Sequence, residues 1–310
     1  MDQSPAQDEV GTAAGPPAAA SWDPIVLDVG VAAFPSRPPA GSGRYPDTVV
    51  DGWSSDRFDV RLASIRGYSH RFYGRPRQDA ASVAFDEGTG SVVFAVADGV
   101  SSARCAERGA ELAVRTAVNM IGTALRAGRN GPDWSALIES ISLRLAEEAR
   151  SPGGDGAAET GRAPADFATT LVAGYARPAV AGGVVTVVQL GDSSAWLLDG
   201  SGFTRLLGSK SDPGGAAVIP SQVAALPAVP ETVEPVTATL PDGSVLLVGT
   251  DGFGDPLGDG TGLVGGLFRS VLRTPPPPLG FAHALDFSRE TFDDDRTLVA
   301  VWARPPAAAG

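Results

Sequence analysis

The stretch Ser91–Ser102, SVVFAVADGVSS, constrains the fold more than any other part of this 310-residue chain. Apolar, β-favouring residues run up to Asp98-Gly99, and two serines and a long amphipathic segment follow. This order predicts a buried strand, a tight turn and the start of a helix. The Asp98 carboxylate is therefore expected at the C-terminal end of a core strand, where a fold displays reactive groups.

The residues after this turn predict an antiparallel pair of helices. Small and apolar residues recur three and four positions apart from Ala103 to Ala127, and again from Asp133 to Ala149. We expect Ser101 or Ser102 to cap the first helix and Asp133 to cap the second. A Gly/Asn-containing loop joins them.

Most of the remaining chain has the pattern of short strands separated by turns. Two further helices are expected, at about Gly262–Arg273 and Phe281–Phe287. An order of strands, a helix pair, strands, helices and a final strand is not a βαβ alternation, and predicts an α+β sandwich of antiparallel sheets with helices outside. The expected strands are Pro24–Phe34, a strand within Arg57–Tyr73, Ser82–Phe85, Ala168–Tyr175, Val184–Leu190, Ala195–Asp199, Phe203–Leu207, Val233–Leu240, Ser244–Gly249 and Arg296–Trp302.

Composition shifts suggest where the domain begins and ends. The first residues are rich in Ala, Pro, Gly and Gln, which favours disorder. Gly208–Pro230 is irregular and is expected to be a mobile flap, and Ser151–Ala163 a flexible linker. The expected organisation is a disordered tail (1–21), an N-terminal extension (22–56), one domain (57–304) and a C-terminal tail (305–310).

Charge and cysteine content exclude several classes of protein. The net charge of −12 and the lack of a basic patch argue against binding to nucleic acid or to an anionic membrane. No apolar run has membrane-spanning length, and the first residues lack the features of a secretory signal. The single cysteine, Cys105, forms no disulfide framework and is expected to be a small core residue rather than a reactive thiol. We therefore expect a cytoplasmic monomer.

Carboxylates recur where apolar strands begin or end. Asp98-Gly99 and Asp251-Gly252 follow such strands, and Asp294 precedes the last one. A single Asp-Gly is most simply a turn, but the repeated setting suggests a shared site. Oxygen-only ligands suit Mg²⁺ or Mn²⁺ rather than zinc, and His70 and His283 lack zinc-ligand spacing.

Taken together, these stretches resemble the protein phosphatase 2C family of metal-dependent Ser/Thr phosphatases, especially its bacterial members. Each stretch is a weak signal alone, but all occur in the family's order over about Arg57–Ala303. The matching stretches are RQDA (Arg77–Ala80), VVFAVADGVSS (Val92–Ser102), FATTLVAGYA (Phe167–Ala176), VVQLGDSSAWLL (Val187–Leu198), LLVGTDGFGD (Leu246–Asp255) and DDDRTLVAVW (Asp293–Trp302).

The resemblance implies a four-layer α/β/β/α sandwich and a site for two Mn²⁺ or Mg²⁺ ions, with a third ion possible. Asp98 would bridge both ions, the Gly99 carbonyl would bind the second, and Asp251 and Asp294 would complete the first. Asp79 would hold a metal-bound water. The implied reaction is direct attack of the bridging water on a phosphate monoester, without a phosphoenzyme.

The sequence also departs from the family pattern. Gly74 stands where the family's phosphate-binding arginine usually lies, so Arg75 or Arg77 would take that role, although a solvated arginine is the default alternative. Gln78 replaces an acidic residue, Ser193-Ser194 replaces Ser-Arg, and Asp295 replaces an asparagine. Asp192 is expected to be structural, and Asp166 is one residue out of register for a third-metal ligand.

Three hypotheses follow for the function. The first is an active Mn²⁺/Mg²⁺-dependent phosphoserine/phosphothreonine phosphatase of a high-GC bacterium, acting on a phosphoprotein such as a Ser/Thr kinase or its targets. The second is an inactive phosphoprotein-binding scaffold, suggested by the altered arginine and Glu-Asp region. The third is a phosphatase that acts on an anti-sigma antagonist. Metal titration separates the second from the others, and a substrate screen separates the first from the third.

Overall fold

The computed structural model describes residues 21–40, 45–151, 162–207 and 225–306. These contain eleven strands and six α-helices. None of the described helices combines the length and apolar character needed to cross a bilayer. The strands are β1 (Thr48–Ser54), β2 (Phe58–Ile65), β3 (Ala80–Asp86), β4 (Ser91–Ala97), β5 (Leu171–Pro178), β6 (Gly183–Leu190), β7 (Ser194–Asp199), β8 (Gly202–Leu207), β9 (Val236–Leu240), β10 (Val245–Gly249) and β11 (Arg296–Ala303).

The helices fall into three groups along the chain. A short helix follows β2, a long pair follows β4, and three shorter helices lie between β10 and β11. A 3₁₀ turn at Pro164–Phe167 precedes β5. The α-helices are α1 (Tyr68–Tyr73), α2 (Ala106–Arg126), α3 (Trp134–Arg150), α4 (Asp251–Leu257), α5 (Leu263–Val271) and α6 (Pro278–Leu285).

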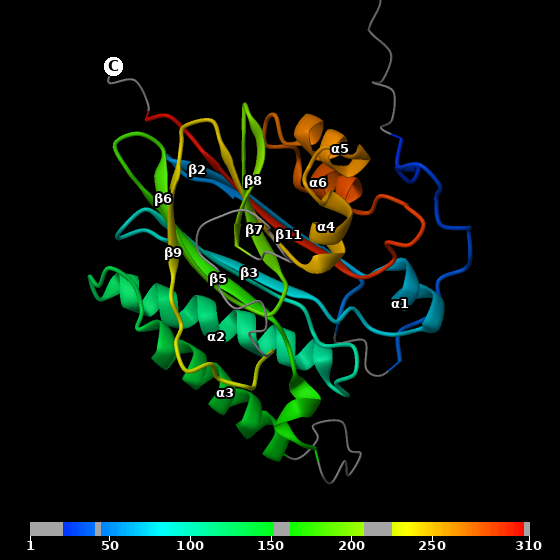
Figure 1. Ribbon diagram of the computed structural model, residues 1–310, viewed down its shortest axis with the longest axis horizontal. Coiled ribbons are helices and arrows are strands. Elements are labelled where there is room, and N and C mark those ends of the chain that lie inside the picture. Colours follow the sequence, from blue (N-terminus) through cyan, green and yellow to red (C-terminus); the bar gives the residue numbers. More distant parts are fainter. Residues whose placement is uncertain (1–20, 41–44, 152–161, 208–224, 307–310) are drawn as a thin grey trace, which may run out of the picture.

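The strands form two antiparallel sheets. One has the order β1-β2-β11-β10-β7-β8, and the other has the order β3-β4-β5-β6-β9. In Figure 1 the pair α2–α3 covers the outer face of the five-stranded sheet, and α4–α6 cover the outer face of the other. The predicted α/β/β/α sandwich is therefore confirmed.

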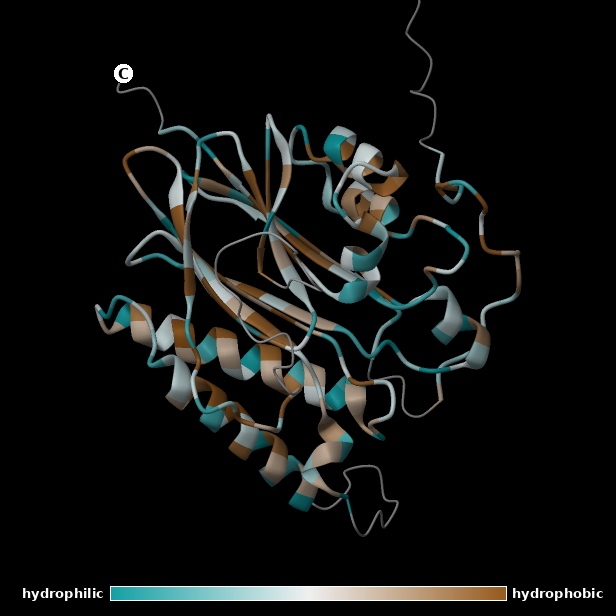
Figure 2. Ribbon diagram, viewed as in Figure 1, coloured by the Kyte–Doolittle hydropathy of each residue, from teal (hydrophilic) through white to brown (hydrophobic). Residues whose placement is uncertain are grey.

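Three apolar cores hold the four layers together. The central core lies between the sheets and includes Phe58, Phe94 and Leu246. A second joins α2 and α3 to the five-stranded sheet, and a third joins α4–α6 to the six-stranded sheet. Figure 2 shows the matching alternation of apolar and polar residues along α2. Because β4 and β10 face a core on both sides, their sequences are continuous apolar runs rather than alternating ones.

Two local predictions are wrong. Pro24–Phe34 forms no strand, since its only pairing is one parallel bridge between Val26 and Ser288. Helix α2 begins at Ala106 with Cys105 at the N-cap position and no side-chain cap, so neither Ser101 nor Ser102 caps it. The other helix cap is confirmed, because the Asp133 carboxylate accepts a hydrogen bond from the Ala136 N–H at 3.0 Å.

Some predictions concern residues that the structure does not describe, and others are refined by it. Residues 1–20, 307–310, most of the expected linker (152–161) and most of the expected flap (208–224) lie outside the described residues. Cys105 is buried in the core beneath α2, as expected. Strand β1, which the sequence did not predict, pairs with β2 along its whole length. We propose on this ground that the domain starts near Thr48 rather than at Arg57.

Candidate metal centre

Antiparallel pairing brings the acidic residues to one end of the sandwich. Asp98 follows β4, and Asp79 precedes β3, which pairs with β4 with Ala80 opposite Ala97. Asp251 follows β10. Both neighbours of β10 run the opposite way, so Asp192, before β7, and Asp294, before β11, lie at the same end. Both sheets therefore contribute carboxylates to one region.

Three of these carboxylates form a compact group. One oxygen each from Asp98, Asp192 and Asp251 lies within 4.8 Å of the others. Asp98 comes from the five-stranded sheet, and the other two come from the six-stranded sheet. The group therefore lies where the corresponding ends of the two sheets meet.

The Asp98 backbone is fixed by the two threonines before β5. Its carbonyl accepts hydrogen bonds from the Thr170 N–H and the Thr169 hydroxyl, both at 2.8 Å. Its N–H donates to the Thr170 hydroxyl at 2.9 Å. These bonds use the backbone of Asp98 and leave its carboxylate directed to the acidic group.

Two glycines allow the neighbouring segments to approach closely. A Cβ atom on Gly99 would lie 2.6 Å from the Ala106 carbonyl oxygen, at the start of α2. A Cβ atom on Gly252 would lie 1.9 Å from the Asp295 carbonyl oxygen. The glycine in each Asp-Gly pair is therefore required by packing of the adjacent segment.

Burial and crowding raise the pKa values of two of these carboxylates, Asp98 and Asp251. Burial, together with Asp79, Asp251 and Asp294, raises the pKa of Asp98 well above its usual value. Burial and the charges of Asp192 and Asp294 raise the pKa of Asp251 to about 6. A bound cation would relieve this repulsion.

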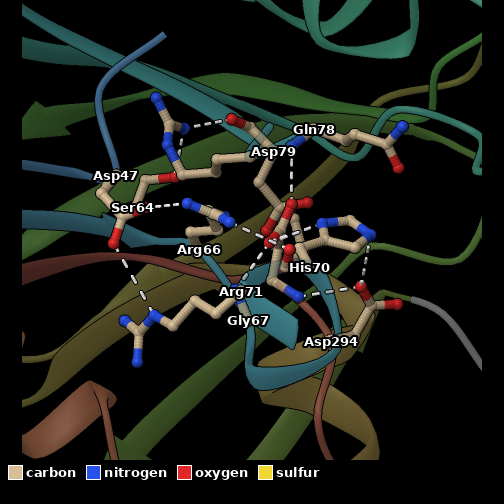
Figure 3. A network of polar contacts seen from close by, with 12 residues as sticks. Asp47, Ser64, Arg66, Gly67, His70, Arg71, Gln78, Asp79 and Asp294 are labelled. Carbon is tan, nitrogen blue, oxygen red and sulfur yellow. Dashed lines mark hydrogen bonds and ion pairs between the residues drawn. The ribbon is translucent and has the colours of Figure 1, made fainter. Parts of the chain in front are cut away.

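Figure 3 shows a second polar cluster, around His70 and Asp294. Its Asp294 is close enough to the first group to raise the pKa of Asp98 and Asp251. The Nδ1 atom of His70, on α1, lies 2.9 Å from an Asp295 carboxylate oxygen, and its Nε2 atom lies 3.9 Å from Asp294. Asp295 also accepts hydrogen bonds from the N–H groups of Gly67 (2.7 Å) and Gln78 (2.6 Å). Burial alone would lower the pKa of His70, but the carboxylates of Asp295 and Asp294 outweigh it and raise that pKa.

Asp79 is buried behind the acidic group. Its Oδ2 atom accepts a hydrogen bond from the Thr250 hydroxyl at 2.8 Å. The same hydroxyl accepts a hydrogen bond from the Thr297 N–H at 3.1 Å. Burial and the charge of Asp295 raise the pKa of Asp79 well above its usual value. Asp79 is thus placed to support residue 251 and its neighbours rather than to contact a large substrate.

The two candidate phosphate-binding arginines differ sharply. Arg77 is buried, and its guanidinium donates to the Ser64 hydroxyl at 2.6 Å, to the Asp79 carbonyl and to the Pro46 carbonyl. Arg75 is exposed, and its guanidinium lies 5.9 Å from the centre of the Tyr73 ring. Only Arg75 has a guanidinium available to an incoming anion.

Sequence reasoning missed two residues of the region. Asp192 was expected to bond its own turn, but among the described residues no hydrogen bond engages its carboxylate, which lies in the acidic group. Its position before β7 was the available signal. His70 gave no signal, since it is far in sequence from its partners. Asp166 lies elsewhere, where it accepts a hydrogen bond from the Ala163 N–H and lies 3.7 Å from Arg104.

The donor set fits a hard divalent cation. Carboxylates converge from several strand ends, and no sulfur or imidazole belongs to the group of Asp98, Asp192 and Asp251. Mg²⁺ and Mn²⁺ prefer such oxygen ligands. The charge of Asp294 raises the pKa of both Asp98 and Asp251, which is the behaviour expected of crowded ligands without their cation.

Solved structures with the same architecture include RsbX and two bacterial serine/threonine phosphatases. RsbX in complex with magnesium aligns with a TM-score of 0.52 and 14% identity, covering 82% of this chain and 100% of RsbX. The S. agalactiae serine/threonine phosphatase gives 0.53 and 16%, covering 79% and 99%. The Mycobacterium tuberculosis serine/threonine phosphatase PstP/Ppp gives 0.52 and 17%, covering 80% and 99%. These similarities establish the fold.

A search of curated proteins found no match to this chain. The family model for protein phosphatase 2C matches residues 66–278, which is more than half of the chain. The matched residues include strands β3 to β10 and the helix pair α2–α3, and with them Asp98, Asp192 and Asp251. The protein therefore belongs to the protein phosphatase 2C family.

Proposed function

We propose that this protein is a metal-dependent phosphatase that hydrolyses phosphoserine and phosphothreonine in proteins. The observation that carries the proposal is the convergence of Asp98, Asp192 and Asp251 from two sheets within 4.8 Å. Mn²⁺ or Mg²⁺, when bound, would supply an activated water and neutralise the phosphoryl oxygens. We assign Asp98, the Gly99 carbonyl, Asp251 and Asp294 as ligands, and Asp192, which shares the acidic group with Asp98 and Asp251, as a further ligand.

The remaining polar residues have supporting roles in this proposal. Asp79 is held by Thr250, next to the ligand Asp251, and would orient water at the centre. Arg75 is assigned to the substrate phosphate, because its guanidinium is exposed and planar and matches phosphate oxygens bidentately. The hydrogen bonds of Arg77 favour a structural role for that residue.

The proposal is tested by hydrolysis of p-nitrophenyl phosphate with and without added Mn²⁺. Wild-type turnover should depend on the metal, and Asp98→Asn should abolish it while the protein stays folded. Asp199→Asn is a matched control, because Asp199 ends β7 at the opposite end of that strand from the acidic group. Turnover that survives both Asp98→Asn and Asp251→Asn would show that the site is wrongly assigned.

Calorimetry separates the proposal from a purely binding role. Metal binding without turnover would favour an inactive phosphoprotein-binding module. The reason to test for such a module is that Gln78 stands where the family has an acidic residue. Absence of both binding and turnover would rule out the metal centre itself.

A further inference from the structure

Helix α1 displays aromatic side chains beside the candidate metal centre. Phe72 is 43% exposed and Tyr73 is 63% exposed. Their rings meet edge to face with centroids 5.0 Å apart, and Phe34 contacts Phe72 in the same way at 5.4 Å. Two arginines extend this surface, with Arg37 5.4 Å from the Phe72 ring centre and Arg75 5.9 Å from that of Tyr73. We call these five residues the α1 patch.

The α1 patch carries uncompensated positive charge. Among the described residues, neither Arg37 nor Arg75 has a carboxylate within ion-pair distance, although the whole chain has a net charge of −12. Arginines nearby behave differently. Arg66 pairs with Asp47 at 2.8 Å, and Arg71 pairs with Asp286 at 3.1 Å. Two unpaired cations on an acidic protein mark a place suited to an anionic partner.

The α1 patch is tied directly to the acidic residues of the candidate centre. The Ser69 N–H donates to the Asp293 carbonyl at 2.8 Å, and His70 lies 3.9 Å from Asp294. The Arg75 N–H in turn donates to the His70 carbonyl at 2.9 Å. A substrate peptide whose phosphate is bound at the candidate metal centre can therefore reach α1 with its next few residues. An extended peptide advances about 3.3 Å per residue.

The combination of rings and cations indicates the kind of partner. Arginines over aromatic rings form a surface that is both apolar and positively charged. A membrane would require a larger cluster of basic residues than these two. A peptide that carries a phosphate and an apolar side chain matches both features. The exposed rings would then gain burial only when such a substrate binds.

We propose that the α1 patch binds the substrate peptide beside its phosphorylated residue, with an apolar or aromatic side chain packed on Phe72 and Tyr73 and an acidic side chain near Arg37. This proposal rests on the proposed phosphatase function. It adds a sequence preference, namely phosphoproteins with a large apolar residue close to the phosphoserine or phosphothreonine.

The test compares phosphothreonine peptides that carry one Phe, within two residues on either side of the phosphate, with an all-alanine peptide. Wild type should favour the best Phe peptide by about 10-fold in kcat/KM, mainly through KM, as expected for one buried side chain. The substitution Phe72→Ala should remove most of this preference. It should leave p-nitrophenyl phosphate turnover unchanged, because the ring that lies against the proposed phosphate-binding Arg75 is that of Tyr73, which is kept.

A matched control is Leu143→Ala, which removes a 63% exposed apolar side chain from α3, on the opposite side of the sandwich. The control should retain the Phe preference. Circular dichroism and urea unfolding check that every variant is folded. Arg37→Ala should raise KM only for peptides that contain an acidic residue.

The possible outcomes separate the two proposals. Metal-dependent turnover of p-nitrophenyl phosphate with no Phe preference in wild type would overturn the α1 patch proposal and leave the phosphatase proposal standing. If wild type hydrolyses nothing, fluorescence anisotropy with the same peptides decides. Phe-dependent binding that is lost in Phe72→Ala would support the patch, and the absence of Phe-dependent binding in wild type would overturn it. The proposal would also be overturned if substitution of the patch turned a dimer into a monomer in sedimentation while peptide kinetics stayed unchanged. A second copy of the protein would then cover the patch.

Discussion

The Nδ1 atom of His70 lies 2.9 Å from Oδ1 of Asp295, and both side chains are buried. The same carboxylate accepts hydrogen bonds from the N–H groups of Gly67 and Gln78. Asp295 therefore joins three segments, namely the start of α1, the loop before β3 and the entry to β11. Two of these segments carry the proposed ligand Asp294 and the proposed support Asp79.

We predict that Asp295→Asn destabilises the metal-free protein by about 1–3 kcal/mol. Asparagine keeps one acceptor oxygen and replaces the other with a donating NH2 group, so one of the two N–H groups that donate to Asp295 would lose its acceptor. Urea unfolding measures the difference. Asp293→Asn is the control, because Asp293 is exposed. Equal stability of the two variants would show that the Asp295 carboxylate is not needed to join these segments.

The metal-free protein should become less stable as pH rises. The pKa of Asp251 is about 6 in the folded protein against a usual value of 3.8, so the folded state holds this proton more tightly than the unfolded chain does. The free energy of unfolding should therefore fall as pH rises from 3.8 through about 6. The pKa of Asp98 is also raised, so this residue should add to the same decline.

Two variants and the metal isolate this effect. Asp251→Asn should weaken the pH dependence and stabilise the metal-free protein at neutral pH by about 1–3 kcal/mol. Added Mn²⁺ should remove the penalty in wild type but have much less effect on the variant. Urea midpoints with EDTA and with Mn²⁺, at about pH 5 and about pH 7.5, measure both results. A metal-free protein whose stability rises with pH would contradict the prediction.

The sequence predicted the elements whose patterns are self-contained. The apolar runs of β4 and β10 and the helical spacing of α2 and α3 depend only on local residues and on burial. Pro24–Phe34 failed because β propensity does not supply a partner strand. Its Val26 and Val29 are 57% and 56% exposed, so the segment runs along the surface instead.

The candidate site was predictable where it follows strand ends and unpredictable where it depends on long-range contacts. Asp98, Asp251 and Asp294 stand next to strong strands, and antiparallel pairing places these strand ends at the same end of the sandwich. His70 meets Asp295 only after β2 and β11 pair, with Ile65 opposite Arg296. The choice between Arg75 and Arg77 depends on which side chain is buried. The sequence of a loop that contains both arginines does not show this.

The Thr250 hydroxyl should matter for metal affinity as well as for stability. Thr250→Val keeps the shape but removes the donor to Asp79 and the acceptor for the Thr297 N–H. We expect a loss of about 1–3 kcal/mol in stability. We also expect Mn²⁺ affinity about 10- to 100-fold weaker, because residues behind metal ligands tune binding to this extent. Urea unfolding and calorimetry measure these losses. Thr250→Ser, which keeps the hydroxyl, should restore most of both, and a valine variant with wild-type affinity would remove Asp79 from the proposed centre.

The two arginines should respond to substitution in opposite ways. Arg75→Ala should leave stability within about 0.5 kcal/mol of wild type, because the side chain is exposed, and should raise KM for phosphate esters. Arg77→Ala should cost about 2–4 kcal/mol, because it leaves the Asp79 carbonyl and the Ser64 hydroxyl without their buried donor. Urea unfolding and steady-state kinetics with p-nitrophenyl phosphate distinguish the two effects. A stable Arg77→Ala protein with a greatly raised KM, beside an Arg75→Ala protein with normal kinetics, would transfer the phosphate-binding role to Arg77, and the hydrogen bonds that hold its guanidinium would then have to break when substrate binds.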